Sequence, residues 1–263
     1  MFRGARLISR SFPPLNRGSR RPETPIDPSG PGWIWGVHAG LAALANPRRK
    51  IERVLATRNA AQRLPDGGWK LELLEPDAID SMLPAGAVHQ GLAIRAAALE
   101  PFELDEACAP VDGRPVLVLD SVTDPQNVGA AYRSAAAFGA RAVIMQDRKS
   151  PPLSGALAKA AAGAVETVPH VRVVNIARTI EALAEMGYLT IGLEGESTLE
   201  LAEALKDDRP AALVLGAEGK GMRDMVANAC ERRARIPIAP DMESLNVSVA
   251  AAIALYEARQ RLK

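Results

Sequence analysis

From Arg114 to the C-terminus, short apolar runs alternate with longer segments whose apolar residues follow helical spacing. The apolar runs predict strands at residues 115–120, 141–146, 167–173, 188–194, 211–216 and 234–238. The segments between them predict helices at about 127–138, 153–162, 175–186, 199–205 and 223–230. Strands that are apolar throughout and separated by helices are typical of a parallel sheet covered on both faces. We therefore expect an α/β unit over residues 114–263.

The last helix of this unit has an unusual pattern. No charged residue occurs from Leu245 to Tyr256, and an uncharged helix of this length is expected to be buried nearly all round. Its N-terminal end carries Ser244, Asn246 and Ser248. Such side chains satisfy the free amides of a first helical turn, and they are equally suited to a ligand site.

Residues 31–100 predict a second, smaller α/β module. Its elements are a helix at about 39–45, ended by Asn46-Pro47, an apolar run at 51–56, a strand at 69–74 and a short helix from Pro76. Residues 101–113 hold four acids, two prolines and no base. They predict a linker between the two units.

Residues 1–30 contain six arginines, five prolines and only two acids. This composition predicts a disordered basic arm. An inert extension, an RNA-contacting tail and an Arg-rich organellar targeting peptide all stay open.

Composition narrows the choice of function without settling it. A length of 263 residues suits two domains, and no apolar run is long enough to span a membrane. The two cysteines and three histidines are scattered, which predicts a reducing compartment and no metal site. A net charge of +1 does not by itself indicate a nucleic-acid partner. Five basic residues do cluster in the smaller module, where they suit either RNA phosphates or a solvated face: Arg48, Arg49, Lys50, Arg53 and Arg58.

Ligands of parallel sheets bind beyond the C-terminal ends of the strands, and two loops there are unusual. Residues 120–140 place Asn127 at a helix start and Arg133 among small residues. Residues 213–222, LVLGAEGKGM, run from a strand into three glycines with Glu218 as the only acid. The glycine order matches neither a P-loop nor the dinucleotide fingerprint, which excludes a nicotinamide-dependent oxidoreductase of the usual type.

Together, NVGAAYRSA, LVLGAEGKGM and IPIAPDMESLNVSVAAAIALYEA resemble the motifs of the SpoU (TrmH) family of S-adenosylmethionine-dependent RNA 2′-O-ribose methyltransferases. The resemblance covers residues 114–263. Residues 35–96, with WGVHAGLAAL and VHQGLAI, are similar to the family's small L30e-like RNA-binding domain. This layout resembles most closely the bacterial 23S rRNA guanosine-2′-O-methyltransferase branch. Gly40, where relatives commonly have a larger aliphatic residue, and the basic arm depart from the family pattern.

The resemblance implies a SPOUT-type parallel sheet with a C-terminal trefoil knot, an arrangement that general topology rules disfavour. It also implies a homodimer, no metal, and S-adenosylmethionine bound at the knot. The implied catalytic residues are Arg133, Asn127, Glu218, Ser244 and Asn246. The implied cofactor-binding residues are Gly216, Ala217, Ile236, Pro237, Ile238, Leu245 and Asn246. The expected RNA-binding residues are Arg48, Arg49, Lys50 and Arg58.

The implied function is transfer of a methyl group to the ribose 2′-OH of a guanosine in 23S rRNA, in the bacterial cytoplasm. A guanidinium stays charged at accessible pH, so we expect Arg133 to bind a phosphate and to stabilise charge on the 2′-oxygen. The proton would pass to Glu218, water or RNA phosphate, or Glu218 would only hold Arg133. Two alternatives stay open: a tRNA ribose methyltransferase, and a non-catalytic RNA-binding or ribosome-assembly factor.

Overall fold

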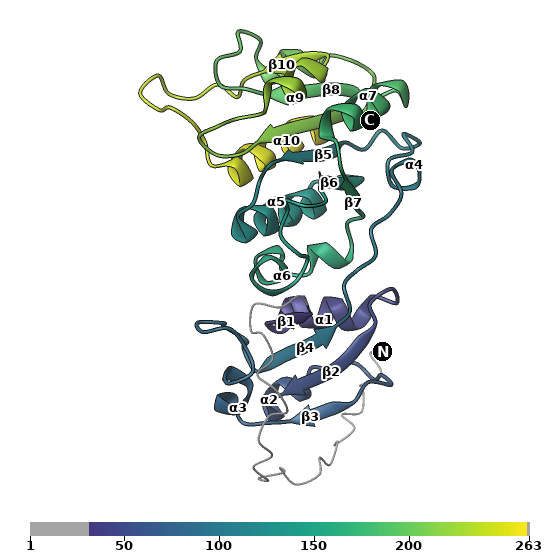
Figure 1. Cartoon of the computed structure of the whole chain (residues 1–263), viewed down its shortest axis with the longest axis vertical. Coiled ribbons are helices and arrows are strands. Elements are labelled where there is room, and N and C mark those ends of the chain that lie inside the picture. The colour runs from purple at the N-terminus through teal and green to yellow at the C-terminus, as the bar shows by residue number, and fades with distance from the viewer. Residues whose placement is uncertain (1–31, 262–263) are drawn as a thin grey trace, which may run out of the picture.

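The computed structural model describes residues 32–261, and the predicted basic arm lies outside the described residues. Within that range the chain forms two sheets, which lie at opposite ends of an elongated molecule (Figure 1). The N-terminal sheet has four strands in the order β1-β4-β2-β3, and the C-terminal sheet has six in the order β10-β8-β9-β5-β6-β7.

The N-terminal sheet is mixed, because β4 runs antiparallel to β1 and β2 while β3 is parallel to β2. Its strands are β1 (Trp33–Trp35), β2 (Ile51–Ala56), β3 (Leu71–Leu73) and β4 (Leu92–Ala96), and its helices are α1 (Val37–Ala45), α2 (Arg58–Ala61) and α3 (Pro76–Asp80). Helix α1 lies close against β4. A Cβ at Gly40 would stand 2.6 Å from the Leu92 side chain, so a larger residue there would have to displace this buried leucine.

The segment predicted as a linker is packed rather than free. It contains α4 (Leu104–Ala107), and Ala107 and Cys108 are buried in the core of the C-terminal sheet. Burial raises the pKa of the Cys108 thiol to about 12. The Phe102 amide donates to the His170 carbonyl at 2.9 Å, which fixes the connector along β7 (His170–Val173).

The C-terminal sheet is parallel throughout, as the apolar runs predict. Its other strands are β5 (Val116–Asp120), β6 (Ala142–Gln146), β8 (Leu189–Leu193), β9 (Ala211–Gly216) and β10 (Arg232–Ala234). The strand predicted at 234–238 is wrong in position. Pro237 and Pro240 cannot donate to a ladder, and after the Arg235–Glu200 bridge the chain is irregular through residue 246.

Helices cover both faces of this sheet. One face packs against α5 (Pro125–Ala137), α6 (Gly155–Ala161), α8 (Leu201–Ala204) and α10 (Val247–Gln260). The other packs against α4, α7 (Ile176–Glu185) and α9 (Asp224–Ala229). Strand β5 shows the alternation directly, because Leu117 and Leu119 join the first core whereas Val116 and Val118 join the second.

Helix α10 packs against α5 and β9, but it is buried on one face only. Val247, Ala251, Ala254, Leu255 and Ala258 are buried. Val249 and Tyr256 are 46% and 48% exposed. In the single chain, the expectation of burial nearly all round is therefore wrong. With the half-buried Ile253, the exposed residues form an apolar stripe at i, i+4 and i+7.

The two units are joined by a shared apolar core and by polar contacts. The Arg49 guanidinium and the Glu166 carboxylate form an ion pair whose side chains are each only 2% exposed. Glu166 ends the short helix η1 (Ala164–Glu166), and it also accepts from Asn46 Nδ2 at 2.8 Å. Nearby, Lys159 Nζ of α6 donates to Gln90 Oε1 at 2.7 Å. Glu166 and Lys159 thus fix the N-terminal sheet against the C-terminal unit.

Candidate active site

Three segments that are distant in sequence meet at the carboxyl edge of the C-terminal sheet. Asn127 lies in the first turn of α5, where its amide donates to the capping Asp124 carboxylate at 2.9 Å. Glu218 follows β9, and Asn246 is the N-cap of α10. The sheet topology brings these ends together, as the motifs predict.

The three side chains form one hydrogen-bond network. Asn127 Nδ2 donates to Glu218 Oε1 at 3.1 Å. Asn246 Nδ2 donates to Asn127 Oδ1 at 2.9 Å and also to Glu218 Oε1. The Val247 amide donates to the same carboxylate oxygen at 3.3 Å. No described residue donates to Glu218 Oε2, so this oxygen is open to a ligand.

The helix cap and the network share one residue. Asn246 Oδ1 accepts from the amides of Ser248 and Val249 and from the Ser248 hydroxyl at 2.9, 3.3 and 2.6 Å. The amide of Asn246 is thereby oriented, because its oxygen serves the helix and its nitrogen serves Asn127 and Glu218. Asn246 therefore caps the helix and joins the network at the same time.

The glycine loop after β9 folds tightly back on itself. Ala217 and Gly221 form an antiparallel bridge, and a Cβ at Gly216 would stand 2.0 Å from the Gly221 backbone. Gly219 and Gly221 have φ of 74° and 65°, a region that favours glycine. The three glycines therefore shape the loop that presents Glu218.

A buried carboxylate holds this loop, and sequence reasoning missed it. Asp120, at the end of β5, is fully buried. It accepts from the Arg223 amide at 3.1 Å and from Arg223 Nε and Nη2 at 3.0 and 2.7 Å. Arg223 closes the glycine loop, so the pair ties that loop to β5. The signal was an acid ending the apolar run VLVLD, which has no reason to be charged unless paired.

Two predicted catalytic residues lie outside the network. Ser244 and Arg133 are exposed, and neither side chain forms a hydrogen bond or ion pair with a described residue. Arg133 follows Asn127 by six positions, which turns its side chain by roughly 120° around α5. The single chain therefore does not bring Arg133 together with Glu218.

The residues expected to bind cofactor lie in the glycine loop and in the segment that leads to α10. Gly216 and Ala217 start the glycine loop, while Ile236, Pro237 and Ile238 lie in the irregular segment after β10. Ile236 packs against the core, Leu245 is half-buried, and Pro237 is exposed. Within residues 236–245 the Met242 amide donates to Ala239 at 3.0 Å, and no other backbone hydrogen bond of this segment joins described residues. Its remaining amides and carbonyls are free to bind a ligand.

The four predicted RNA-binding residues have different surroundings. Lys50 and Arg58 are exposed, and Arg48 lies over the Phe102 ring at 3.7 Å while donating to the Glu100 carbonyl. Arg49 is buried against Glu166 and also donates to the Ala97 carbonyl at 3.0 Å. The prediction that Arg49 contacts RNA is corrected by this burial. Its partner Glu166 lies 117 positions away in the chain, so the sequence alone does not distinguish Arg49 from a free basic residue.

Two classes of alternative site were also sought in the structure. In the part of the chain that the structure describes, no group of three His, Cys, Asp or Glu side chains is suited to a metal ion. No helix over residues 32–261 combines the length and apolarity needed to cross a bilayer.

Comparison with known proteins agrees with the geometry. Residues 114–256 match the model of the SpoU rRNA Methylase family. The 23S rRNA (guanosine-2′-O-)-methyltransferase RlmB of Vibrio cholerae is 41% identical over 244 residues, which cover 87% of this chain and 97% of that protein. The enzyme of the same name from Ralstonia nicotianae is 40% identical over 236 residues, covering 86% and 94%.

Solved structures show the same architecture. The AdoMet-bound rRNA methyltransferase from Sinorhizobium meliloti superposes with a TM-score of 0.74 at 26% identity, covering 88% of both chains. The AdoMet complex of the SpoU methyltransferase AviRb from Streptomyces viridochromogenes gives 0.73 at 21% identity, covering 87% and 89%, and supports the fold alone. The resemblance inferred from the three motifs is confirmed: this chain belongs to the SpoU rRNA methylase family.

Proposed function

We propose that this protein transfers a methyl group from S-adenosylmethionine to the ribose 2′-OH of a guanosine in 23S rRNA. The observation that carries the proposal is the network of Asn127, Glu218 and Asn246, assembled at the carboxyl edge of a chain that matches 97% of an rRNA guanosine methyltransferase at 41% identity. A binding factor without catalysis has no need of an oriented carboxylate with one open oxygen.

The residues present fit S-adenosylmethionine. The irregular segment 236–245 offers backbone donors and acceptors without described partners, which suit the hydrogen-bonding edge of adenine. Ile238 and Met242 are 37% and 56% exposed there, so they offer apolar contacts to the ring. Gly216 and Ala217 would approach the ligand with backbone. When bound, the cofactor supplies an electrophilic methyl group on a sulfonium.

The protein's share of the reaction is alignment, charge stabilisation and removal of the hydroxyl proton. Alignment alone contributes several kcal/mol. Glu218 Oε1 is held by Asn127, Asn246 and the Val247 amide, so its open Oε2 is the acceptor we assign to the 2′-OH proton. The Arg133 side chain is exposed and unpaired among described residues, so it is free to bind a phosphate. Because one chain turns Arg133 away from Glu218, stabilisation of charge on the 2′-oxygen would come from Arg133 of a second copy of the chain. Recognition of the 2′-OH selects RNA over DNA.

The test uses tritiated S-adenosylmethionine with undermethylated 23S rRNA and, separately, tRNA. Label on a guanosine 2′-oxygen of the rRNA is expected, whereas label on tRNA alone would overturn the assignment of substrate. Arg133→Ala is expected to abolish turnover with cofactor affinity nearly intact, and Glu218→Gln to lower kcat more than KM. Wild-type rates in either variant would contradict its role.

We extend the proposal to the fold and its assembly. Strand β10 lies at the sheet edge next to β8, yet α10 returns to pack against α5 and β9. That return supports a C-terminal trefoil knot. The exposed apolar stripe of Val249, Ile253 and Tyr256 supports packing of α10 against a second copy of the chain. The four-stranded sheet would be an L30e-like domain that binds RNA through Arg48, Lys50 and Arg58, in the cytoplasm where rRNA resides.

A further inference from the structure

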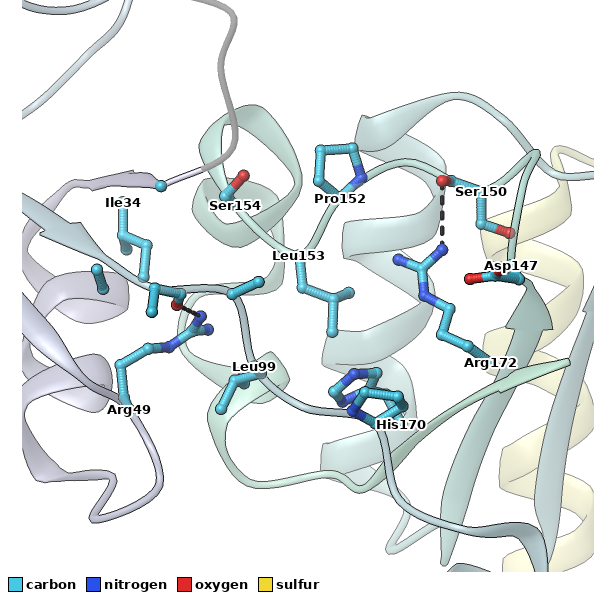
Figure 2. A pocket seen from close by; sticks show the side chains of 15 residues that line it. Ile34, Arg49, Leu99, Asp147, Ser150, Pro152, Leu153, Ser154, His170 and Arg172 are labelled. Carbon is cyan, nitrogen blue, oxygen red and sulfur yellow. Dashed lines mark hydrogen bonds between the residues drawn. The ribbon is translucent and has the colours of Figure 1, made fainter.

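A cavity of about 350 Å³ lies between the two units (Figure 2), and its lining includes none of Asn127, Glu218 and Asn246. The N-terminal sheet contributes Ile34, the connector contributes Leu99, and the loop after β6 contributes Leu153. Arg49, His170 and Arg172 supply polar groups. The volume is at the lower end of small-ligand pockets, and apolar walls with a few polar groups are typical of such sites.

The floor of the cavity contains a neutral hydrogen-bonding side chain. His170 is only 3% exposed, and Figure 2 shows its ring beside Leu99 and Leu153. Burial, with the nearby charges of Arg172, Arg48 and Arg49, lowers the pKa of His170 to about 4. A neutral imidazole has one nitrogen that donates and one that accepts, so His170 offers an acceptor nitrogen to the cavity that it lines.

The loop that forms one wall is fixed from below. The Arg172 guanidinium donates to the carbonyls of Gln146 and Ser150, each at 3.3 Å, and to that of Pro151 at 2.7 Å. Because one half-buried guanidinium binds three backbone carbonyls, the path of residues 147–151 is fixed. Arg148 and Lys149, at the outer turn of this loop, are exposed and form no ion pair or hydrogen bond with a described residue. They lie between Asp147 and Ser150, which line the cavity, so this turn offers two positive charges to phosphates next to one carboxylate.

The loop belongs to the same sheet edge as the catalytic network. Gln146 ends β6, and its Oε1 accepts from the Ser121 hydroxyl at 3.2 Å. Ser121 directly follows Asp120, which holds the glycine loop through Arg223. The loop after β6, which forms one wall of the cavity, therefore starts at the edge where a parallel sheet binds its ligands.

We propose that this cavity receives an unpaired nucleotide of the RNA substrate, distinct from the methylated one, while Arg148 and Lys149 bind the adjoining phosphates. The base lies between the apolar walls, and its amino group donates to the acceptor nitrogen of His170. Sequence-selective RNA binding works through bases splayed out of single strands, with phosphate contacts fixing the register. The proposal rests on the proposed function for the identity of the RNA.

The variant Ala98→Phe tests the cavity, because Ala98 lines it and is itself exposed, so a ring can fill the space without disturbing the core. Ala85→Phe, at an exposed position outside the cavity lining, is the matched control. Binding of an undermethylated 23S rRNA fragment is measured at several salt concentrations, together with S-adenosylmethionine affinity and thermal unfolding. We expect at least a tenfold rise in the RNA dissociation constant for Ala98→Phe alone, with cofactor affinity and melting temperature unchanged.

The double variant Arg148→Gln/Lys149→Gln tests the phosphate contacts. It is expected to weaken RNA binding and to reduce the slope of log K against log salt by roughly 1.4 for two phosphate contacts on a single strand. Ala98→Phe is expected to leave that slope unchanged, because it removes space and no charge. Wild-type RNA affinity in both variants would overturn the proposal.

The outcomes separate this proposal from the function itself. If Ala98→Phe weakens RNA binding but the wild type transfers no methyl group, the cavity assignment stands and the activity fails. If the wild type methylates rRNA and Ala98→Phe binds and methylates equally well, only the cavity assignment fails. Guanosine 5′-monophosphate is titrated as a free nucleotide. If it binds the wild type and not Ala98→Phe while RNA affinity is equal, the cavity is a small-molecule site and the RNA assignment is overturned.

Discussion

Arg49→Met is expected to lower the free energy of unfolding by about 3 kcal/mol, because it leaves the Glu166 carboxylate buried without its cation. In the wild type, Arg49 donates to Glu166 at 2.6 and 3.2 Å and to the Ala97 carbonyl at 3.0 Å. After the change, Asn46 is the donor that stays on the carboxylate. Removal of one partner from a buried pair costs about 3–5 kcal/mol, and we take the lower end because Asn46 remains.

The double variant Arg49→Met/Glu166→Met distinguishes the cost of an unpaired buried charge from the cost of losing the packing of the two side chains. Replacing both partners by apolar side chains is often neutral or stabilising. Here the Asn46 amide and the Ala97 carbonyl lose their partners, at about 1 kcal/mol in total because Asn46 is half-exposed to water. The double variant should therefore be more stable than Arg49→Met by about 2 kcal/mol.

Urea unfolding gives the measurement. The three tryptophans, Trp33, Trp35 and Trp69, all lie in the N-terminal unit, so their fluorescence reports on that unit, while far-ultraviolet circular dichroism reports on the whole chain. With an m-value of about 2 kcal/mol/M, Arg49→Met should lower the midpoint by about 1.5 M. The tryptophan and dichroism transitions should shift together, because the apolar core is continuous between the two units.

Arg53→Met is the matched control. Arg53 forms a similar two-pronged pair with Glu72 at 2.8 and 3.0 Å, but the side chains are 31% and 25% exposed. Exposed pairs contribute about 0–1 kcal/mol, so this variant should shift the midpoint little. Equal losses for Arg49→Met and Arg53→Met, or a double variant less stable than Arg49→Met, would refute the reasoning.

Three further predictions concern the site, pH and assembly. Asp120→Asn should lower kcat at least tenfold while the fold persists, because it weakens the grip on Arg223; single-turnover kinetics with unchanged rates would contradict this. Burial lowers the pKa of His170 from 6.5 to about 4. The unfolded chain therefore takes up a proton on this residue before the folded one does, so about 3 kcal/mol of the free energy of unfolding is present above pH 6.5 and is lost as the pH falls towards 4. Unfolding of His170→Phe should lack this pH dependence, whereas His38→Phe, at an exposed position, should retain it. Tyr256→Glu should halve the mass measured by light scattering, and an unchanged mass would place the subunit contact elsewhere.

Much of the C-terminal fold could be predicted because nearly every apolar run there forms a buried parallel strand. The runs at 115–120 and 211–216 became adjacent parallel strands with Asp120 opposite Gly216. The strand predicted at 234–238 failed because apolar periodicity outweighed the two prolines that prevent a ladder. The absence of charge along α10 predicted a helix buried nearly all round, yet in the single chain Val249 and Tyr256 are exposed and form an apolar face.

The sequence motifs predicted which residues meet at the candidate site only where the fold places whole loops together. Asn127, Glu218 and Asn246 meet as expected, because loops after parallel strands share an edge. Arg133 does not join them in one chain, since helical geometry turns it away. Arg49 was misjudged because its partner Glu166 is over a hundred positions distant in the chain, and pairing at that range leaves no local pattern.

The order of strands has a consequence for how the chain is made. The N-terminal sheet draws all its strands from residues 33–96, so it can fold while the rest is still being translated. The central strand β5, in contrast, gains its second neighbour only when β9 emerges, and α10 follows last of all. Closure of the larger sheet must therefore wait for nearly the whole polypeptide, and non-local pairing of this kind is slow. We expect nascent chains stalled before residue 211 to carry a protease-resistant N-terminal unit and an unfinished, chaperone-binding remainder.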